Sequence, residues 1–155
     1  MANVNTSKIT PFLWFESEAE AAAKLYTSIF ENSRITDTSR TGGKVMTVTF
    51  EVDGQRLMAL NGGPHYQLSP AFSLFVSVDS QAELDRIWDA LLAGGGKPTR
   101  CGWLVDRYGL SWQVIPTTLI KLMTDADPGR AGRAVQAMMG MMKLDIAELE
   151  RAANG

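Results

Sequence analysis

Two side chains, His65 and Cys101, could act as a general base or as a nucleophile. They are the only histidine and the only cysteine among 155 residues. His65 follows a Gly-Gly-Pro loop, where an imidazole could accept a proton. Cys101 follows Arg100, whose charge could stabilise a thiolate. The alternatives are a solvated loop histidine and a small buried cysteine. One His and one Cys exclude Cys₄, Cys₂His₂ and His₃ zinc sites, and also an intrachain disulfide.

Two further motifs resemble functional signatures but also fit structural roles. Glu16, Glu18 and Glu20 could form a carboxylate site, yet they lie at an expected helix start, where acidic side chains favour the helix dipole. The run Gly94-Gly95-Gly96-Lys97 lacks the spacing of a Walker loop and follows a helix, which it is expected to end. No G-x-G-x-x-G motif follows a strand, so a Rossmann cofactor site is not expected.

Aromatic and polar residues share several segments of strand length. A curved sheet carrying such residues is typical of a small-molecule site, in which apolar walls surround a few hydrogen-bonding groups. The alternative is a filled core whose polar groups satisfy one another. The predicted ligand contacts are Trp14, Phe15, Asn61, Ser73, Phe75, Trp103 and Gln113.

Periodicity predicts two similar halves, each with the order β-α-β-β-β. The first half is expected to hold a helix over 18–30 capped by Ser17, and an Asp53-Gly54 hairpin. The second half is expected to hold a helix that starts at a Ser80–Glu83 capping box. The predicted strands are 10–15, 34–40, 44–52 and 55–61, then 71–78, 97–100, 103–106 and 110–116. We expect modules at about 8–63 and 71–116 within a single domain, 1–155.

Residues 117–155 differ in character and predict helices over 117–123 and 129–142, with a last helix capped by Asp145 and ending at Ala153. Four of the eight methionines lie between Met138 and Met142. Methionine adapts to irregular packing, so this cluster could fill a gap against the sheet or a second subunit. Alternatively, it could form a lid over an apolar ligand.

Composition excludes several function classes. The chain has 15 Lys plus Arg against 17 Asp plus Glu, scattered along the sequence, which gives a formal charge of −2 and no basic field for nucleic acid. Residues 1–8 lack the apolar region of a secretory signal. The uncharged run over 57–78 contains Gly, Pro and polar residues, so two strands and a loop are expected rather than a membrane span. We expect a cytoplasmic protein that does not bind a membrane.

The paired halves resemble the vicinal oxygen chelate superfamily, which includes glyoxalase I, extradiol dioxygenases and bleomycin-resistance proteins. Within it, the chain resembles the PhnB-like family over nearly its whole length, including the Asp127-Pro128 helix start and the Met-rich helix. The resemblance implies an α+β fold in which two βαβββ modules form a half-barrel around a cavity, and it implies a homodimer. The blocks that carry it are Ile9–Phe15, Val45–Phe50, Met58–Pro64, Cys101–Trp103 and Tyr108–Pro116.

The resemblance also implies positions for a metal. Superfamily enzymes hold one divalent ion with side chains from four strands, and these positions fall near Pro11, Ala59, Ser73 and Gln113. Only Gln113 carries a good ligand, and a single neutral amide is too weak to hold the ion. No cofactor is therefore expected, with a divalent metal at a non-standard site as the alternative.

The leading hypothesis is a metal-free homodimer that binds a small, partly apolar or aromatic molecule between its two halves. One alternative is a lyase, isomerase or transferase that uses His65, Cys101 or a non-standard metal site. Another is an interaction protein in which the methionine helix mediates dimerisation. Proteins similar to this one often carry the label 3-demethylubiquinone-9 3-methyltransferase, but the chain lacks the Gly-rich loop and doubly wound domain of S-adenosylmethionine enzymes.

Overall fold

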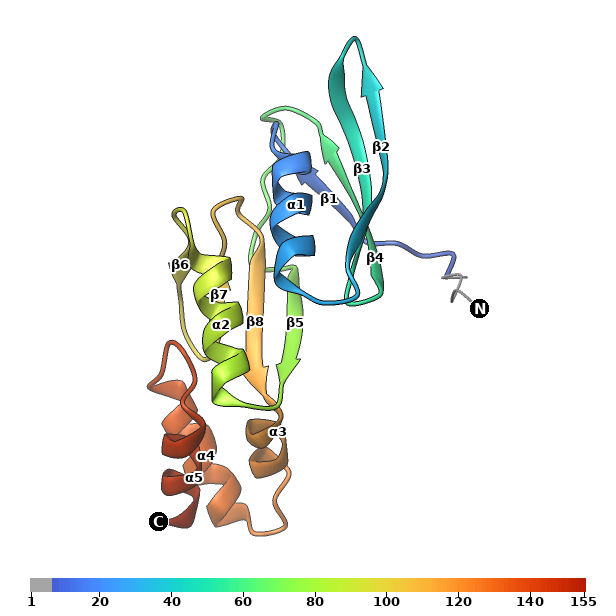
Figure 1. Ribbon diagram of the computed structural model, residues 1–155. Helices are drawn as coiled ribbons and strands as arrows, with labels where there is room; N and C mark the ends of the chain where they lie inside the picture. Colours follow the sequence, from blue (N-terminus) through green and yellow to red (C-terminus); the bar gives the residue numbers. More distant parts are fainter. Residues whose placement is uncertain (1–6) are drawn as a thin grey trace, which may run out of the picture. The chain divides into compact units, whose positions relative to one another are not determined.

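The computed structural model describes residues 7–155, which divide into two compact units (Figure 1). Unit 1 ends at Leu68, and unit 2 comprises Ser69–Gly155. Each unit contains a four-stranded sheet and the same β-α-β-β-β order, and unit 2 continues into helices. The prediction of an α+β fold with two βαβββ modules and C-terminal helices is confirmed.

The sheet of unit 1 has the order β1-β4-β3-β2. Strand β1 runs parallel to β4, and the other neighbours are antiparallel. Asp53 and Gly54 join β3 to β4 with φ of 49° and 78°, the positive angles that a tight hairpin turn requires, so the predicted hairpin is confirmed. The elements are β1 (Phe12–Phe15), α1 (Ala19–Ile29), β2 (Arg34–Thr41), β3 (Lys44–Val52) and β4 (Gln55–Asn61).

Alternation along the strands separates the two faces of this sheet. Val48 and Phe50 of β3 are fully buried and lie opposite Ala59 and Leu57 of β4, which are also fully buried. The ring of Tyr26 on α1 lies 6.2 Å from that of Phe50, measured between centroids. Helix α1 therefore covers this face and closes the core of unit 1.

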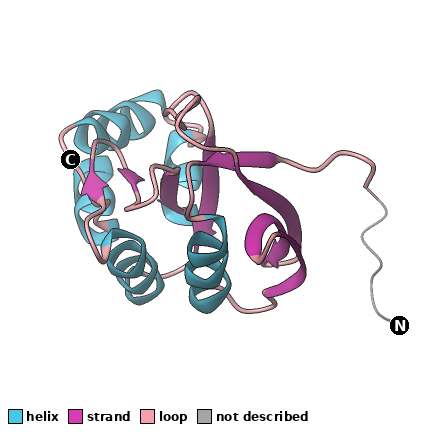
Figure 2. Ribbon diagram, turned by 90° about the horizontal axis from the view of Figure 1, so that it is seen from above, coloured by secondary structure: helices cyan, strands magenta, loops and turns pink. Residues whose placement is uncertain are grey.

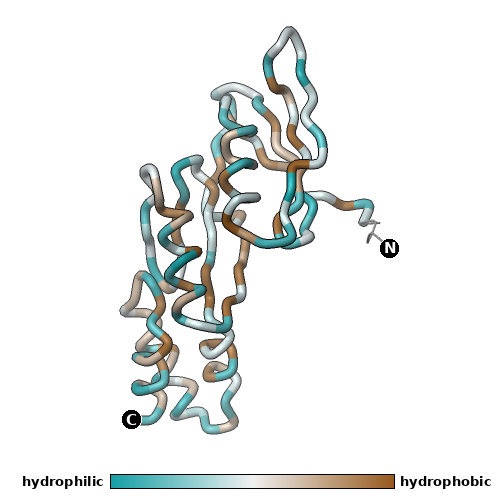
Figure 3. The backbone as a smooth tube through the Cα atoms, viewed as in Figure 1, coloured by the Kyte–Doolittle hydropathy of each residue, from teal (hydrophilic) through white to brown (hydrophobic). Residues whose placement is uncertain are grey.

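Unit 2 repeats the pattern with the sheet order β5-β8-β7-β6, in which β5 runs parallel to β8. Helix α2 buries Leu84, Ile87 and Leu91, and hydrophobic and hydrophilic segments alternate along it in Figure 3. The uncharged run over 57–78 forms parts of β4 and β5 with a loop between them, which confirms the prediction of two strands and a loop. The elements are β5 (Ser73–Val78), α2 (Gln81–Leu92), β6 (Lys97–Pro98), β7 (Trp103–Val105) and β8 (Ser111–Pro116).

Helix capping agrees with the sequence in unit 2 but not in unit 1. Ser80 Oγ accepts a hydrogen bond from the Glu83 amide, and Asp145 Oδ1 accepts one from the Glu148 amide. In contrast, the N-cap residue of α1 is Glu18, and its side chain makes no capping hydrogen bond. The prediction that Ser17 caps this helix is therefore wrong.

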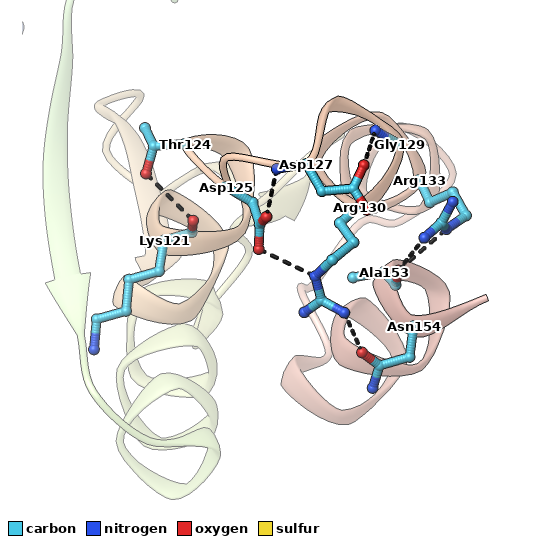
Figure 4. A network of polar contacts seen from close by, with 9 residues as sticks. All are labelled: Lys121, Thr124, Asp125, Asp127, Gly129, Arg130, Arg133, Ala153 and Asn154. Atoms are coloured by element: carbon cyan, nitrogen blue, oxygen red, sulfur yellow. Dashed lines mark hydrogen bonds and ion pairs between the residues drawn. The ribbon is translucent and has the colours of Figure 1, made fainter.

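Three helices follow β8 and form a small cluster at one end of unit 2, coloured orange to red in Figure 1. A polar network joins them: Arg130 Nε donates to Asp125 Oδ2 at 3.1 Å, and the Arg133 guanidinium donates twice to the Ala153 carbonyl (Figure 4). None of the helices within residues 7–155 combines the length and the hydropathy that a bilayer span requires. The helices are α3 (Thr117–Met123), α4 (Pro128–Met139) and α5 (Ile146–Asn154), and Figure 2 draws the helices in cyan.

Candidate functional site

The face of the unit 2 sheet opposite α2 brings together three of the predicted ligand contacts. Phe75 pairs in register with Gln113, and Gln113 pairs with Trp103, so the three side chains lie side by side on one face. Phe75 is 52% exposed, although it is large and apolar. We call the face defined by Ser73, Phe75, Trp103, Ser111 and Gln113 the open face of unit 2.

Polar groups on the open face are partly paired with each other. Gln113 Nε2 donates to Ser73 Oγ at 3.0 Å, which leaves the Gln113 amide oxygen free for a ligand donor. Ser111 pairs in register with Ser73, and its buried hydroxyl has no hydrogen-bond partner among residues 7–155. A buried hydroxyl without a partner lowers the free energy of unfolding, and nearly all buried polar groups in protein cores are hydrogen-bonded. In this respect the sheet around Ser111 differs from an ordinary core.

A surface pocket of about 620 Å³ adjoins Trp103 at the turn between β6 and β7. The turn has positive φ at Cys101 and Gly102, and the Trp103 amide closes it by donating to the Arg100 carbonyl. A segment after α4 also lines the pocket, because the Cys101 and Gly102 amides each donate to its carbonyls at 2.8 Å. The lining residues are Pro98, Thr99, Arg100, Cys101, Trp103 and Met142.

The two candidate catalytic residues have no assisting partner in the described part of the chain. His65 is exposed in the loop between β4 and β5 and makes no side-chain hydrogen bond to residues 7–155. Cys101 is partly buried in the pocket wall, with an exposed arginine as its neighbour in sequence. Neither residue forms the nucleophile–base pair that covalent catalysis would use.

In unit 1, the Trp14 side chain lies on the sheet face opposite α1. Its Nε1 donates to the Gly63 carbonyl at 3.0 Å, and its ring meets Tyr66 edge-on, with ring centroids 5.0 Å apart. The indole packs directly on Gly62, where an added Cβ would lie only 2.3 Å from it. Trp14 is therefore a fixed aromatic surface rather than a freely rotating contact.

Two predicted ligand contacts lie on the helix-covered face instead. Phe15 is 4% exposed and pairs in register with Asn61, so both side chains point to the side of α1. Asn61 Oδ1 accepts a hydrogen bond from the Ala19 amide at 2.8 Å, and its Nδ2 donates to the Val45 carbonyl. Asn61 thus supplies the cap that Ser17 does not, and both its polar groups are occupied. We remove Phe15 and Asn61 from the candidate site.

The residues at the implied metal positions do not fit a metal. Ala59 is fully buried on the α1 side and lacks a donor atom, and Pro11 also lacks one. Ser73 and Gln113 share a hydrogen bond. Within residues 7–155, no group of three or more His, Cys, Asp or Glu side chains could hold an ion. We derive no chemical step through a metal.

Sequence reasoning did not identify Phe12 and Met58 as part of the uncovered sheet face of unit 1, although alternation along the strands indicates it. The hairpin at Asp53-Gly54 sets Phe50 opposite Leu57 and Val48 opposite Ala59, which places Asn61 on the core face by alternation. The same count places Met58, and with it Phe12, on the face that α1 leaves uncovered. No sequence signal indicated that Met142 lines a pocket with Trp103, since this contact joins segments far apart in the chain.

Mixed sheets with one helix-covered face, repeated in two β-α-β-β-β units, define a glyoxalase-like α+β protein. The family model described as 3-demethylubiquinone-9 3-methyltransferase matches residues 7–115. The chain belongs to this family. The match ends within β8, so the similarity that we expected through Asp127-Pro128 and the Met-rich helix lies outside the matched residues and stays a prediction.

Solved structures agree with this assignment. A PhnB protein from Bacillus cereus has 33% identity and a TM-score of 0.67, covering 71% of this chain and 99% of that protein. Protein PA1353 from Pseudomonas aeruginosa has 22% identity and a TM-score of 0.60, covering 72% of this chain and 98% of that protein, and it supports the fold alone. No curated protein matches the chain significantly.

Proposed function

We propose that this chain binds a small, partly apolar or aromatic molecule without a metal, and that the open face of unit 2 carries the binding. The observation behind the proposal is that Phe75 and Trp103 flank Gln113 on the sheet face opposite α2, with Phe75 half exposed. Apolar side chains around a few hydrogen-bonding groups are the usual composition of a ligand site. Phe75 and Trp103 would provide apolar contacts, and Ser73 and Gln113 would orient the ligand.

We do not propose methyl transfer, although the family description names it. Methyltransferases that use S-adenosylmethionine normally bind it on a doubly wound parallel sheet with a Gly-rich loop after the first strand. Here each sheet mixes one parallel pair with antiparallel pairs. The fold of the described residues thus offers no counterpart of that cofactor site.

The test is a screen of a metabolite and antibiotic library by thermal shift and tryptophan fluorescence. Compounds that bind should raise the melting temperature of the wild type. Phe75→Ala should weaken their binding about tenfold, because a large apolar contact contributes about 1.5 kcal/mol or more. Ile120→Ala, which removes an exposed apolar side chain from α3, should leave binding unchanged. Equal binding by both variants would contradict the proposal.

Metal analysis of protein purified without chelator tests the metal-free part. We expect less than stoichiometric metal, because Gln113 is the only good ligand among the implied positions. Stoichiometric Mn, Fe, Ni or Zn, with Gln113 among its ligands, would overturn this part.

Sedimentation equilibrium checks the homodimer that the family resemblance implies, and a monomer at all concentrations would contradict it.

A further inference from the structure

We propose that the pocket at the β6–β7 turn holds the carboxylate of a small apolar acid, with Arg100 as the anion-binding group. The inference rests on the proposed function, since Trp103 belongs both to the open face and to the pocket. It adds the charge of the ligand and a role for the C-terminal segment. Neither follows from the family match, which ends at residue 115.

Arg100 is an exposed cation with no partner in the described structure. Its guanidinium makes no ion pair or hydrogen bond with residues 7–155, whereas six other cations do form ion pairs there. The surface around it is mainly apolar, provided by Pro98, Trp103 and Met142. An unpaired guanidinium beside an apolar wall complements a molecule with an apolar body and one carboxylate, which arginine can bind through two hydrogen bonds.

The C-terminal segment completes the pocket through backbone contacts. The Met141 and Met142 carbonyls accept hydrogen bonds from the Cys101 and Gly102 amides, each at 2.8 Å. Two residues after Met142, Leu144 is fully buried. A Cβ added at Gly102 would lie 3.0 Å from Leu144 Cδ1, so glycine permits this close approach. Met142 is held against the turn by these contacts, although its side chain is 58% exposed.

The only cysteine of the chain lines the pocket and provides a local reporter. Iodoacetate and iodoacetamide alkylate the same thiol with similar chemistry but differ by one negative charge. We expect the ratio of iodoacetate to iodoacetamide rates at Cys101 to be about threefold higher in the native chain than in the urea-unfolded chain at low salt, because a nearby cation attracts the anionic reagent. Mass spectrometry of the modified peptide measures both rates.

Matched variants assign the effect to Arg100. Arg100→Gln should remove the native preference for iodoacetate, whereas Lys121→Gln, which removes an equal charge from an exposed position on α3, should retain it. Added salt should reduce the preference. The proposal is overturned if Arg100→Gln keeps the preference, if the native ratio does not exceed the unfolded one, or if neither reagent reaches native Cys101.

A ligand experiment separates this inference from the proposed function. 2-Naphthoate should slow the alkylation of Cys101 by iodoacetamide at lower concentration than 2-naphthamide does. Met142→Ala should weaken this protection, and Met139→Ala, equally exposed but outside the pocket, should not. Equal protection by acid and amide would overturn the carboxylate site while supporting apolar binding. No protection and no fluorescence change with either compound would count against both proposals.

Discussion

At the scale of single residues, Asn61 shows how one side chain can belong to the fold rather than to the site. Its Oδ1 accepts from the Ala19 amide, an orphan donor at the start of α1, while Nδ2 donates to Val45. Asn61→Ala should lower the free energy of unfolding by about 1–2 kcal/mol, the usual effect of losing a helix cap. Urea unfolding followed by circular dichroism measures the change.

Ser17→Ala is the matched control for the cap. Ser17 is exposed and does not cap α1, so its loss should change the unfolding free energy by less than about 0.5 kcal/mol. Equal effects of the two substitutions would show that Asn61 does not act as the cap.

Asp106 is a buried carboxylate that organises the turn between β7 and β8. It is 4% exposed and accepts hydrogen bonds from the Tyr108 and Leu110 amides and from Trp112 Nε1. Asp106→Ala should destabilise the protein by about 3 kcal/mol or more, because three donors lose a charged acceptor, one of them on a buried indole. A denaturation midpoint close to that of the wild type would contradict this role.

At the scale of elements, Asp125 joins α3 to α4. The Asp127 amide and then the Arg130 guanidinium donate to its carboxylate and lower its pKa below the ordinary value of 3.8. A depressed pKa in the folded state stabilises the protein above the unfolded pKa, and this stabilisation is lost as the pH falls through the folded value.

Asp125→Asn should therefore be less stable than the wild type near pH 6, and the difference should shrink below about pH 4. Urea unfolding at several pH values, with Asp127→Asn as a second variant that retains an N-cap acceptor, measures this dependence. A difference that is constant from pH 6 to pH 3 would show that the carboxylate charge does not matter.

Most elements follow from local sequence, and the errors lie where tertiary contacts override it. The Asp53-Gly54 hairpin, the Ser80–Glu83 cap and the α3 limits are local signals, and the structure confirms them. The α1 cap could not be read locally, because the acceptor is 42 positions away in sequence. Trp14 and Phe15 are consecutive residues of β1, so alternation places them on opposite faces, and only Trp14 lies on the face that α1 leaves uncovered.

At the scale of the whole molecule, the C-terminal segment packs against the part of the chain that matches the family model, residues 7–115, and Gly102 lies at this contact. A Cβ there would lie 2.8 Å from Ile115 Cδ1 and 3.0 Å from Leu144 Cδ1, and the φ of +85° adds strain for any other residue. Gly102→Ala should destabilise the protein by about 2–3 kcal/mol, from overpacking and backbone strain together.

Gly109→Ala provides the control for backbone strain alone. Its φ is +90°, but apart from its two chain neighbours no atom of residues 7–155 lies within 4 Å of an added Cβ, so we expect a smaller loss of about 1 kcal/mol. Differential scanning calorimetry of both variants separates the two contributions. Equal losses of unfolding free energy in the two variants would show that the contact with Leu144 does not contribute to stability.

The central claim is that the open face of unit 2 binds a small apolar molecule, and NMR tests it most directly. Titration of ¹⁵N-labelled protein with small apolar acids should shift the side-chain amide of Gln113 and the indole signal of Trp103. The side-chain amide of Asn61 and the indole of Trp112, which are both engaged in the fold, should stay in place. Shifts at Asn61 or Trp112 with none at Gln113 and Trp103, or no shifts at any of the four, would contradict the claim.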